Sequence, residues 1–102
     1  MHFEWDKNKN ETNKKKHNVS FDEAKTVFLD YNALYMPDPE HSESEERFII
    51  LGMSTKANLL IVCHCYRKAD TTIRIISARK ADKREQQKYY EGWFYVRPLW
   101  FF

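Results

Sequence analysis

The hydrophobic pattern of the chain changes its period within the stretch IRIISARKADKREQQKYY, residues 73–90. Its first part, residues 73–78, is rich in β-branched side chains and predicts a buried strand. From Arg79 onward the side chains are long, straight and mostly charged, which favours a helix. Because neither Gly nor Pro separates the two parts, we expect the strand to pass almost directly into the helix.

One arginine of this predicted strand stands out. Alternate side chains of a strand point to opposite faces of the sheet. This alternation places Arg74 on the same face as Ala78. It places Ser77 on the opposite face, together with Ile75. An arginine in so apolar a strand is costly unless its guanidinium reaches water, an acid or a phosphate. Arg74 is therefore the first indication of a functional site.

The remaining apolar runs predict the rest of a sheet. Residues 58–66 are apolar on both faces, so they are the expected central strand. Residues 46–53 and 72–78 are the expected neighbours, which gives an antiparallel meander. Residues 33–36 predict a short fourth strand, and residues 3–5 could form another short strand at the start of the chain.

Polar caps predict two helices before this meander. Asp6 can cap a helix that runs to about Lys16, although residues 7–16 contain no apolar side chain. Such a helix would rest on its flanks. Ser20 and Glu23 form the capping-box pattern at the start of a second helix. The predicted fold class is α+β: a compact antiparallel sheet of three to four strands, two N-terminal helices and one C-terminal helix.

The length of the chain bounds its organisation. With 102 residues there is room for one hydrophobic core, and we expect a single domain over residues 1–92. Residues 93–102, WFYVRPLWFF, form an aromatic extension too short to span a bilayer. This extension could cover the sheet, bind a partner or be unnatural, and the sequence leaves these alternatives open. Without a signal peptide or a run of about 18 apolar residues, a cytoplasmic protein is expected, with no membrane association.

Charge is unevenly distributed along the chain. The formal net charge of +2 conceals two basic ends around an acidic middle. Clustered basic charge favours polyanions through counterion release, whereas the alternative is a set of solvated faces. The last helix, expected to end near Gly92, has one basic side: Lys80, Lys83, Arg84 and Lys88.

Four segments carry a resemblance to a known family when they are taken together. They are FEWDKNKNETNKKKHNVSFDEA, DPEHSESEERFIILG, LLIVCHCY and IRIISARKADKREQQKYYE. In this order they resemble the BrnT family of bacterial toxins, the ribonuclease partners of BrnA antitoxins. The resemblance extends from Phe3 to Glu91 and implies a compact fold similar to the RelE-type toxins.

The resemblance also implies a function and partners. It implies metal-independent RNA cleavage, with no cofactor and no bound metal. It implies a tight complex with a BrnA-like antitoxin of the ribbon-helix-helix type. DNA would be contacted only through this antitoxin, by which the pair represses its own promoter.

Metal-independent cleavage sets the chemistry that the site must supply. The ribose 2′-hydroxyl is the nucleophile, so the substrate must be RNA. The enzyme must move protons to and from oxygen and stabilise charge on the phosphate. The guanidinium fork holds phosphate oxygens in fixed geometry. We therefore expect Arg74 and Arg79 to clamp the scissile phosphate, with Arg47 and Lys9 assisting.

The proton-transfer groups are less well defined by the sequence. Glu46 or His17 is the expected base or acid, with His64 in reserve, although a core position is the commoner role for His64. Glu46 and Arg47 should lie on opposite faces of one strand, and a surface ion-pair network is the alternative for both. Trp5 could stack on a base or simply pack in the core. Further RNA contacts are expected from the last helix: Lys80, Lys83 and Arg84.

Two other functions use the same features. A non-catalytic nucleic-acid-binding module would retain RNA without cleaving it, and its binding would be sensitive to salt. A protein-interaction domain would depend on the aromatic extension instead. The family resemblance ranks the ribonuclease above both alternatives.

Overall fold

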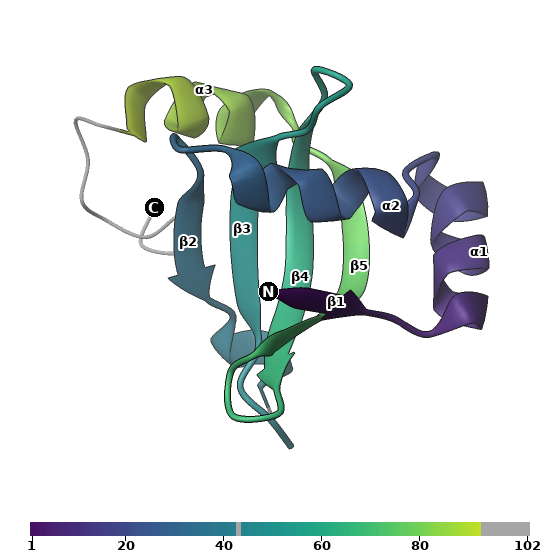
Figure 1. Ribbon diagram of the computed structural model, residues 1–102. Coiled ribbons are helices and arrows are strands. Elements are labelled where there is room, and N and C mark those ends of the chain that lie inside the picture. The colour runs from purple at the N-terminus through teal and green to yellow at the C-terminus, as the bar shows by residue number, and fades with distance from the viewer. Residues whose placement is uncertain (43, 93–102) are drawn as a thin grey trace.

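The computed structural model describes residues 1–42 and 44–92, in which one sheet lies between helices on its two faces (Figure 1). The order of the strands in the sheet is β1-β5-β4-β3-β2. The strands are β1 (His2–Glu4), β2 (Leu34–Pro37), β3 (Phe48–Met53), β4 (Leu59–Arg67) and β5 (Thr72–Lys80). The α-helices are α1 (Lys7–His17), α2 (Phe21–Ala24) and α3 (Lys83–Glu91), and the 3-10 helices are η1 (Lys25–Leu29) and η2 (Pro39–His41).

The predicted α+β fold class is confirmed; the sheet has five strands instead of three to four, because the possible short strand at the start of the chain forms as β1 and joins it. Strands β2 to β5 pair in antiparallel fashion in the predicted order. β1 adds a fifth strand, which runs parallel to β5 at the edge of the sheet. Three residues carry little periodicity, so their pairing with a strand seventy positions later follows from packing and not from the local pattern.

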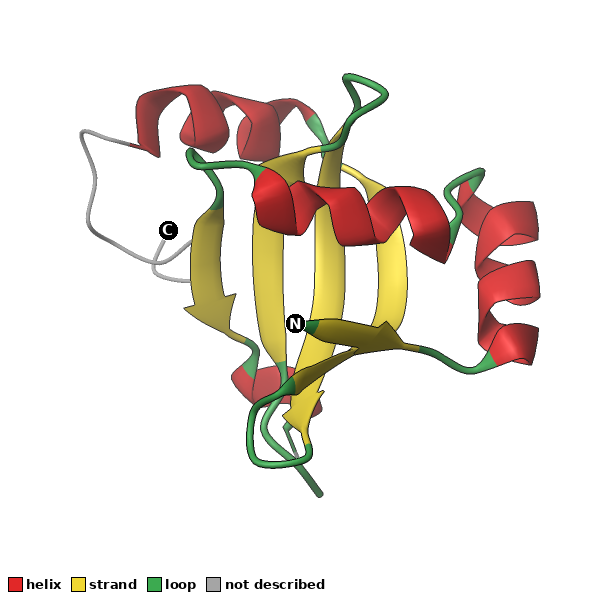
Figure 2. Ribbon diagram, viewed as in Figure 1, coloured by secondary structure: helices red, strands yellow, loops and turns green. Residues whose placement is uncertain are grey.

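One face of the sheet holds the main hydrophobic core, under α2 and η1, which cross the strands in Figure 2. Each large apolar side chain buried there stabilises the fold by about 1.5–3 kcal/mol. Members of this core without measurable exposure are Val19, Phe21, Val27, Ile50, Leu60 and Val62. We call this the core face; it fixes the backbones of β4 and β5 from one side.

Helix α1 has no apolar side chain and is held to the sheet by an asparagine. The buried Asn13 amide donates to the carbonyl oxygens of Val19 at 2.8 Å and Ala78 at 2.9 Å. Its oxygen accepts the Ala78 backbone N–H at 3.1 Å. Asp6 caps the start of the helix by accepting the N–H of Asn8 at 2.8 Å. The predicted helix is confirmed; its flanks, Trp5 and Val19, pack in the main core as expected, and Asn13 adds a polar attachment.

The second predicted cap is half formed. Ser20 Oγ accepts the backbone N–H of Glu23 at 3.1 Å, as the capping pattern requires. The Glu23 carboxylate does not return to the start of the helix. It accepts instead from Ser54 Oγ at 2.7 Å and from the Asn58 amide at 2.8 Å. This carboxylate therefore ties α2 to the turn between β3 and β4.

A β-bulge in β5 changes which side chains share a face. Ser77 and Ile75 lie opposite consecutive residues of β4, so Ile76 has no partner in the ladder. Ala78 consequently joins Ile75 in the core, and Ser77 lies on the other face. The expectation that Ala78 shares a face with Arg74 is wrong, as is the pairing of Ser77 with Ile75. One extra residue reverses the alternation beyond it.

The same bulge gathers polar side chains on the second face of the sheet. Arg74 and Arg79 are five residues apart and would lie on opposite faces of a regular strand. With the bulge, Arg74, Ser77 and Arg79 all lie opposite alternate residues of β4, which share one face: Cys65, Cys63 and Ile61.

Helix α3 covers only part of this second face. Leu51, Ile61 and Ala81 are buried there, with Tyr89 of α3 packed against them. The Tyr89 hydroxyl donates to Asp30 at 2.6 Å, which fixes the helix to the turn before β2. The part of the second face beyond α3, which we call the open face, carries the polar recess described below.

The C-terminal helix ends at the predicted position but begins four residues later than the change of pattern at Arg79 predicts, because β5 continues through Arg79 and Lys80. Only Ala81 and Asp82 separate β5 from α3, and Gly92 is the C-cap. A Cβ atom at Gly92 would lie 2.8 Å from a Leu34 methyl carbon, so glycine permits the helix end to approach β2. The predicted aromatic extension lies outside the described residues. Within residues 1–42 and 44–92, no helix has the length and hydropathy to cross a membrane.

Candidate active site

A polar recess lies on the open face, with a volume of about 210 Å³. Its apolar floor is formed by Ile49, Ile61 and Ile76 from three adjacent strands. Polar side chains surround this floor: Asp38, His41, Arg47, Cys63, Ser77 and Arg79. We call it the arginine recess. A neighbouring hollow of about 470 Å³ shares Asp38 and Arg79 with it and extends to Glu85 of α3.

Arg79 is held on one side of the recess by an acid of α3. Its guanidinium donates two hydrogen bonds to Glu85, each of 2.8 Å. The same carboxylate accepts the Asp82 N–H at 2.9 Å, in a full capping box at the start of α3. The hydrogen bond from Arg79 holds the pKa of Glu85 below its usual value. Arg79 is therefore fixed in orientation and partly neutralised, while its side chain remains 43% exposed.

Arg47 also lines the recess and has a weaker ion pair than Arg79. Its contact with Glu45 is long, at 4.0 Å, and Glu45 is closer to Arg67, at 3.0 Å. The buried Nε of Arg47 has no hydrogen-bond partner among the described residues. A buried donor without a partner is costly. The weakly compensated charge of the Arg47 guanidinium would stabilise an anion in the recess that it lines.

The turn from Asp38 to Ser42 is tied to Arg47 through the backbone. The Ser42 hydroxyl donates to the Asp38 carbonyl at 2.7 Å and accepts the Arg47 N–H at 2.9 Å. The Asp38 N–H donates to the Arg47 carbonyl at 2.8 Å, which continues the pairing of β2 with β3. These three hydrogen bonds fix η2 beside the start of β3.

This turn presents a histidine paired with a carboxylate. His41 Nδ1 lies 2.9 Å from Asp38 Oδ2. A carboxylate only accepts, so Nδ1 carries a proton in this pair and Nε2 is the nitrogen left for other partners. The Asp38 side chain is 11% exposed, whereas that of His41 is 62% exposed. Sequence reasoning missed this pair because it treated the segment as an acidic loop; the signal was Asp and His three residues apart, just before a strand.

Cys63 lies under the same carboxylate as a neutral thiol. Its Sγ is 3.9 Å from Asp38 Oδ2. Burial, together with the nearby Asp38 charge, raises the pKa of Cys63 to about 11. Cys63 and Cys65 are both free of disulfides. A thiol that stays protonated at neutral pH is a poor nucleophile, so Cys63 acts here as a hydrogen-bond donor and a packing group.

Comparison with known families identifies the chain. The family model described as "Ribonuclease toxin, BrnT, of type II toxin-antitoxin system" matches residues 5–85. The chain belongs to the BrnT family. BrnT proteins are ribonuclease toxins, so RNA is the substrate class and an antitoxin is the partner class. The arginine recess lies within the matched residues.

The fold comparison agrees with this assignment. The crystal structure of the Brucella abortus ribonuclease toxin BrnT matches with a TM-score of 0.64 and 21% sequence identity. The match covers 81% of this chain and 99% of that chain. At this identity it establishes a BrnT-like fold for the chain. A search of curated proteins found no match.

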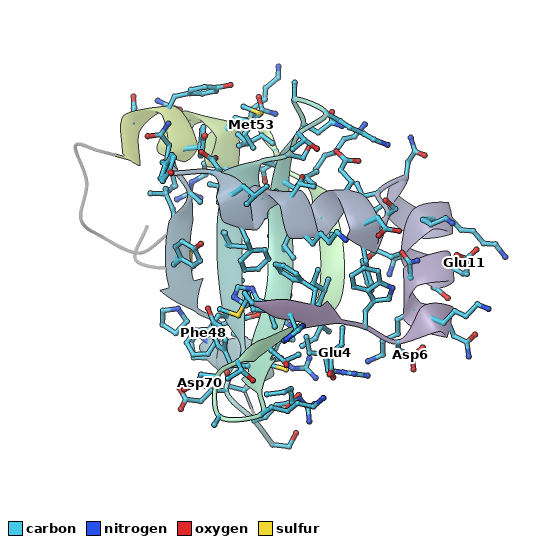
Figure 3. The ribbon with its side chains drawn as sticks, viewed as in Figure 1. Glu4, Asp6, Glu11, Phe48, Met53 and Asp70 are labelled. Carbon is cyan, nitrogen blue, oxygen red and sulfur yellow. The ribbon has the colours of Figure 1, made fainter. Side chains whose placement is uncertain are left out.

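Two of the three arginines expected to act together, Arg47 and Arg79, line the recess of this BrnT-family chain. Arg74 is on the same face of β5 but does not line the recess; it forms a 2.7 Å ion pair with Glu4 of β1. Glu46 and Arg47 were expected within the strand, but both precede β3; Glu46 lines a separate hollow with Phe48 and Asp70, both labelled in Figure 3.

The other predicted site residues lie away from the recess. His17 and Lys9 are on α1, which docks at the edge of β5 through the backbone groups of Ala78. The Trp5 ring packs edge-on against Phe21, with centroids 6.0 Å apart, which is the core alternative for this residue. Three basic residues are exposed at the junction of β5 with α3: Lys80, Lys83 and Arg84.

His64 is a core residue in this BrnT-family fold. It has no measurable exposure, and its ring packs against Phe28 with centroids 4.9 Å apart. Burial lowers the pKa of His64 to about 4, so the imidazole is neutral at pH 7. Because water and substrate do not reach it, His64 contributes to packing and not to chemistry on RNA.

Proposed function

We propose that the chain cleaves RNA without a metal ion, and that the arginine recess is where the scissile phosphate binds. The observation that carries this proposal is that Arg47 and Arg79 line the same recess. Arg47 directly precedes β3, Arg79 is in β5, and the bulge in β5 brings Arg79 to this face.

Arg79 and Arg47 are suited to different roles in binding the scissile phosphate. Arg79 is orientated by Glu85, so its remaining donors are held in place before RNA arrives. Arg47 brings a second cation to the recess, with only a long 4.0 Å contact to Glu45, so its guanidinium would interact favourably with an incoming phosphate oxygen. Charge that grows on the phosphate during attack by the 2′-hydroxyl is stabilised by groups that need no rearrangement.

Residues outside the recess have supporting roles in this proposal. Arg74, on the same face, and the exposed cations of the last helix would hold the RNA backbone on either side of the scissile phosphate. Lys9 and Trp5 would act only on RNA that extends to α1, beside the β5 edge of the sheet. Glu46 and His17 lie outside the recess, so we do not assign proton transfer to either.

Incubation of purified protein with single-stranded RNA in excess EDTA tests the catalytic proposal. We expect cleavage in EDTA, with a 2′,3′-cyclic phosphate on the upstream product, and no cleavage of DNA of the same sequence. Loss of cleavage in EDTA that a divalent ion restores would contradict metal independence. Salt-sensitive RNA binding without cleavage would favour the non-catalytic module.

The proposed cellular role follows from family membership. We infer that the chain acts in the cytoplasm as a single domain over residues 1–92, inhibits translation and growth, and is neutralised by a BrnA-like ribbon-helix-helix antitoxin. Expression with and without a small protein encoded beside it tests this role. Growth arrest that the companion relieves supports the proposal, and harmless expression of folded protein contradicts it.

A further inference from the structure

The arginine recess lacks an assigned group for proton transfer, and few side chains are available for it. Asp38 is nearly buried and occupied by His41 and Cys63. Glu85 is committed to Arg79 and to the cap of α3. Guanidinium groups stay charged and the Cys63 thiol stays protonated at neutral pH. Among the described residues that line the recess, His41 is the one imidazole.

We propose that His41 is the catalytic base and acid of the recess, and that Asp38 is its positioning residue. This inference rests on the proposed function and deepens it. The 2.9 Å contact fixes the imidazole with Nδ1 facing the carboxylate, which leaves Nε2 to exchange protons with the substrate. A buried carboxylate behind an exposed imidazole is the arrangement that sets tautomer and orientation in other acyl- and phosphoryl-transfer sites.

The backbone places this imidazole beside the phosphate site. Asp38 lies between Pro37 and Pro39, whose rings restrict the turn. Two hydrogen bonds of Ser42 and the Asp38–Arg47 backbone pair then fix the turn to β3. His41 and Arg47 are therefore held on neighbouring segments by the same network, and both line the recess in which we propose that the phosphate binds.

The proton balance closes within the recess. Neutral His41 accepts the proton of the ribose 2′-hydroxyl through Nε2 as the 2′-oxygen forms its bond to phosphorus. The bond from phosphorus to the 5′-oxygen of the next nucleotide then breaks. The imidazolium returns its proton to that departing oxygen, which leaves a 2′,3′-cyclic phosphate, a 5′-hydroxyl and neutral His41. No oxidant, reductant or further reactant is needed.

The competing interpretation is that His41 has only a structural role and stabilises the turn by donating a hydrogen bond to Asp38. His41→Asn separates the two roles, because the asparagine amide can still donate to Asp38 but cannot exchange a proton. We expect His41→Asn to lower the single-turnover rate of RNA cleavage by about 10²–10⁴-fold, with an unchanged thermal melt. Binding of an RNA blocked by 2′-O-methyl groups should also be unchanged. His2→Asn, at an exposed position on β1, is the matched control and should cleave like the wild type.

Two further measurements test the role of His41 if the His41→Asn variant folds poorly. If the melt of His41→Asn falls, His41→Ala is assayed below its own melting temperature with and without free imidazole. Recovery of cleavage with imidazole supports the inference, and no recovery overturns it. For Asp38→Asn we expect a lower kcat with unchanged KM and melt, as for a group that positions the base.

The outcomes distinguish this inference from the proposed function on which it rests. A wild-type protein that does not cleave RNA overturns the proposed function. A wild type that cleaves, with His41→Asn within about threefold of its rate, overturns only the role of His41 and leaves a structural staple. Loss of cleavage in His41→Asn with intact folding and RNA binding supports both.

Discussion

The two faces of the sheet are built from the same strands but have different roles: the core face holds the hydrophobic core, and the open face carries the arginine recess. On the core face, β4 and β5 contribute apolar side chains that α2 and η1 bury completely. On the open face, the same strands contribute Cys63, Ser77 and Arg79 to a recess that α3 leaves uncovered. The stability of the fold and the candidate chemistry are therefore separated by one layer of backbone.

Two histidines show how much the face matters. His64 lies in the core face among aromatic rings, and burial keeps its imidazole neutral. His41 lies at the margin of the open face, with an Asp38 contact on one nitrogen and solvent access. The same residue type is a packing group in one position and a candidate base in the other.

The largest effect is expected from a cavity on the core face. Leu60→Ala removes a fully buried side chain and should lower the free energy of unfolding by about 3 kcal/mol. Ile49→Ala, on the half-buried floor of the recess, should cost about 1 kcal/mol. Urea denaturation of both variants measures the difference, and equal costs would contradict the separation of the two faces.

The second largest effect is expected from Arg47→Ala, which should lower RNA cleavage without lowering thermal stability. Arg47→Ala should lower RNA cleavage by about 10²-fold, because it removes a charged donor from the phosphate site. The thermal melt should hold or rise, since the variant also removes a buried Nε without a partner. Arg67→Ala, which removes the other arginine bound to Glu45, is the control and should cleave at nearly the wild-type rate. Equal losses in the two variants would indicate a general charge effect.

The Asn13 side chain, which attaches α1 to β5, should contribute almost as much to the free energy of unfolding as the buried Leu60 side chain. Asn13→Ala removes the hydrogen bonds that dock α1 and leaves the Ala78 backbone groups without partners, at a cost of about 2 kcal/mol. Asn8→Ala, on the exposed side of the same helix, should be nearly neutral. Calorimetric melts compare the two, and a neutral Asn13→Ala would mean that α1 is held by its flanks alone.

The smallest effect is expected from the ion pair at the margin of the recess. The pKa of Glu85 is lowered in the fold, so its contribution to stability is present above its ordinary value of 4.5 and is lost as pH falls through the lowered value. Glu85→Gln should remove this part of the acid dependence of the melt, about 0.5 kcal/mol for such an exposed pair. Melts recorded from pH 3 to pH 6 would contradict this if the two proteins had the same slope.

Local patterns predicted most of the elements because their causes are local. The β-branched run before Arg79, the Asp6 and Ser20 caps and the two-sided apolar strand at residues 58–66 each act within a few residues. The pairing of β1 with β5 and the docking of α1 through Asn13 depend on residues more than sixty positions apart. No local pattern contains that information.

The arginine recess could not be predicted from the sequence because it too depends on contacts between distant segments. The bulge at Ile76 is a property of how β5 pairs with β4, and it reversed the expected face of Ser77. The His41–Asp38 pair is created by a turn whose shape depends on Ser42 and the start of β3. Arginine chemistry was recognisable from residue type, but which arginines meet was decided by three-dimensional pairing.

A double-mutant cycle on Arg47 and Arg79 tests the central claim most directly, by single-turnover cleavage of one RNA in EDTA. If both guanidinium groups hold the same phosphate, each alanine substitution alone should cost at least about 10²-fold, and the double variant should lose less than the product of the two. A wild-type rate in either single variant, or losses that multiply as for independent sites, would contradict the arginine recess as the site of cleavage.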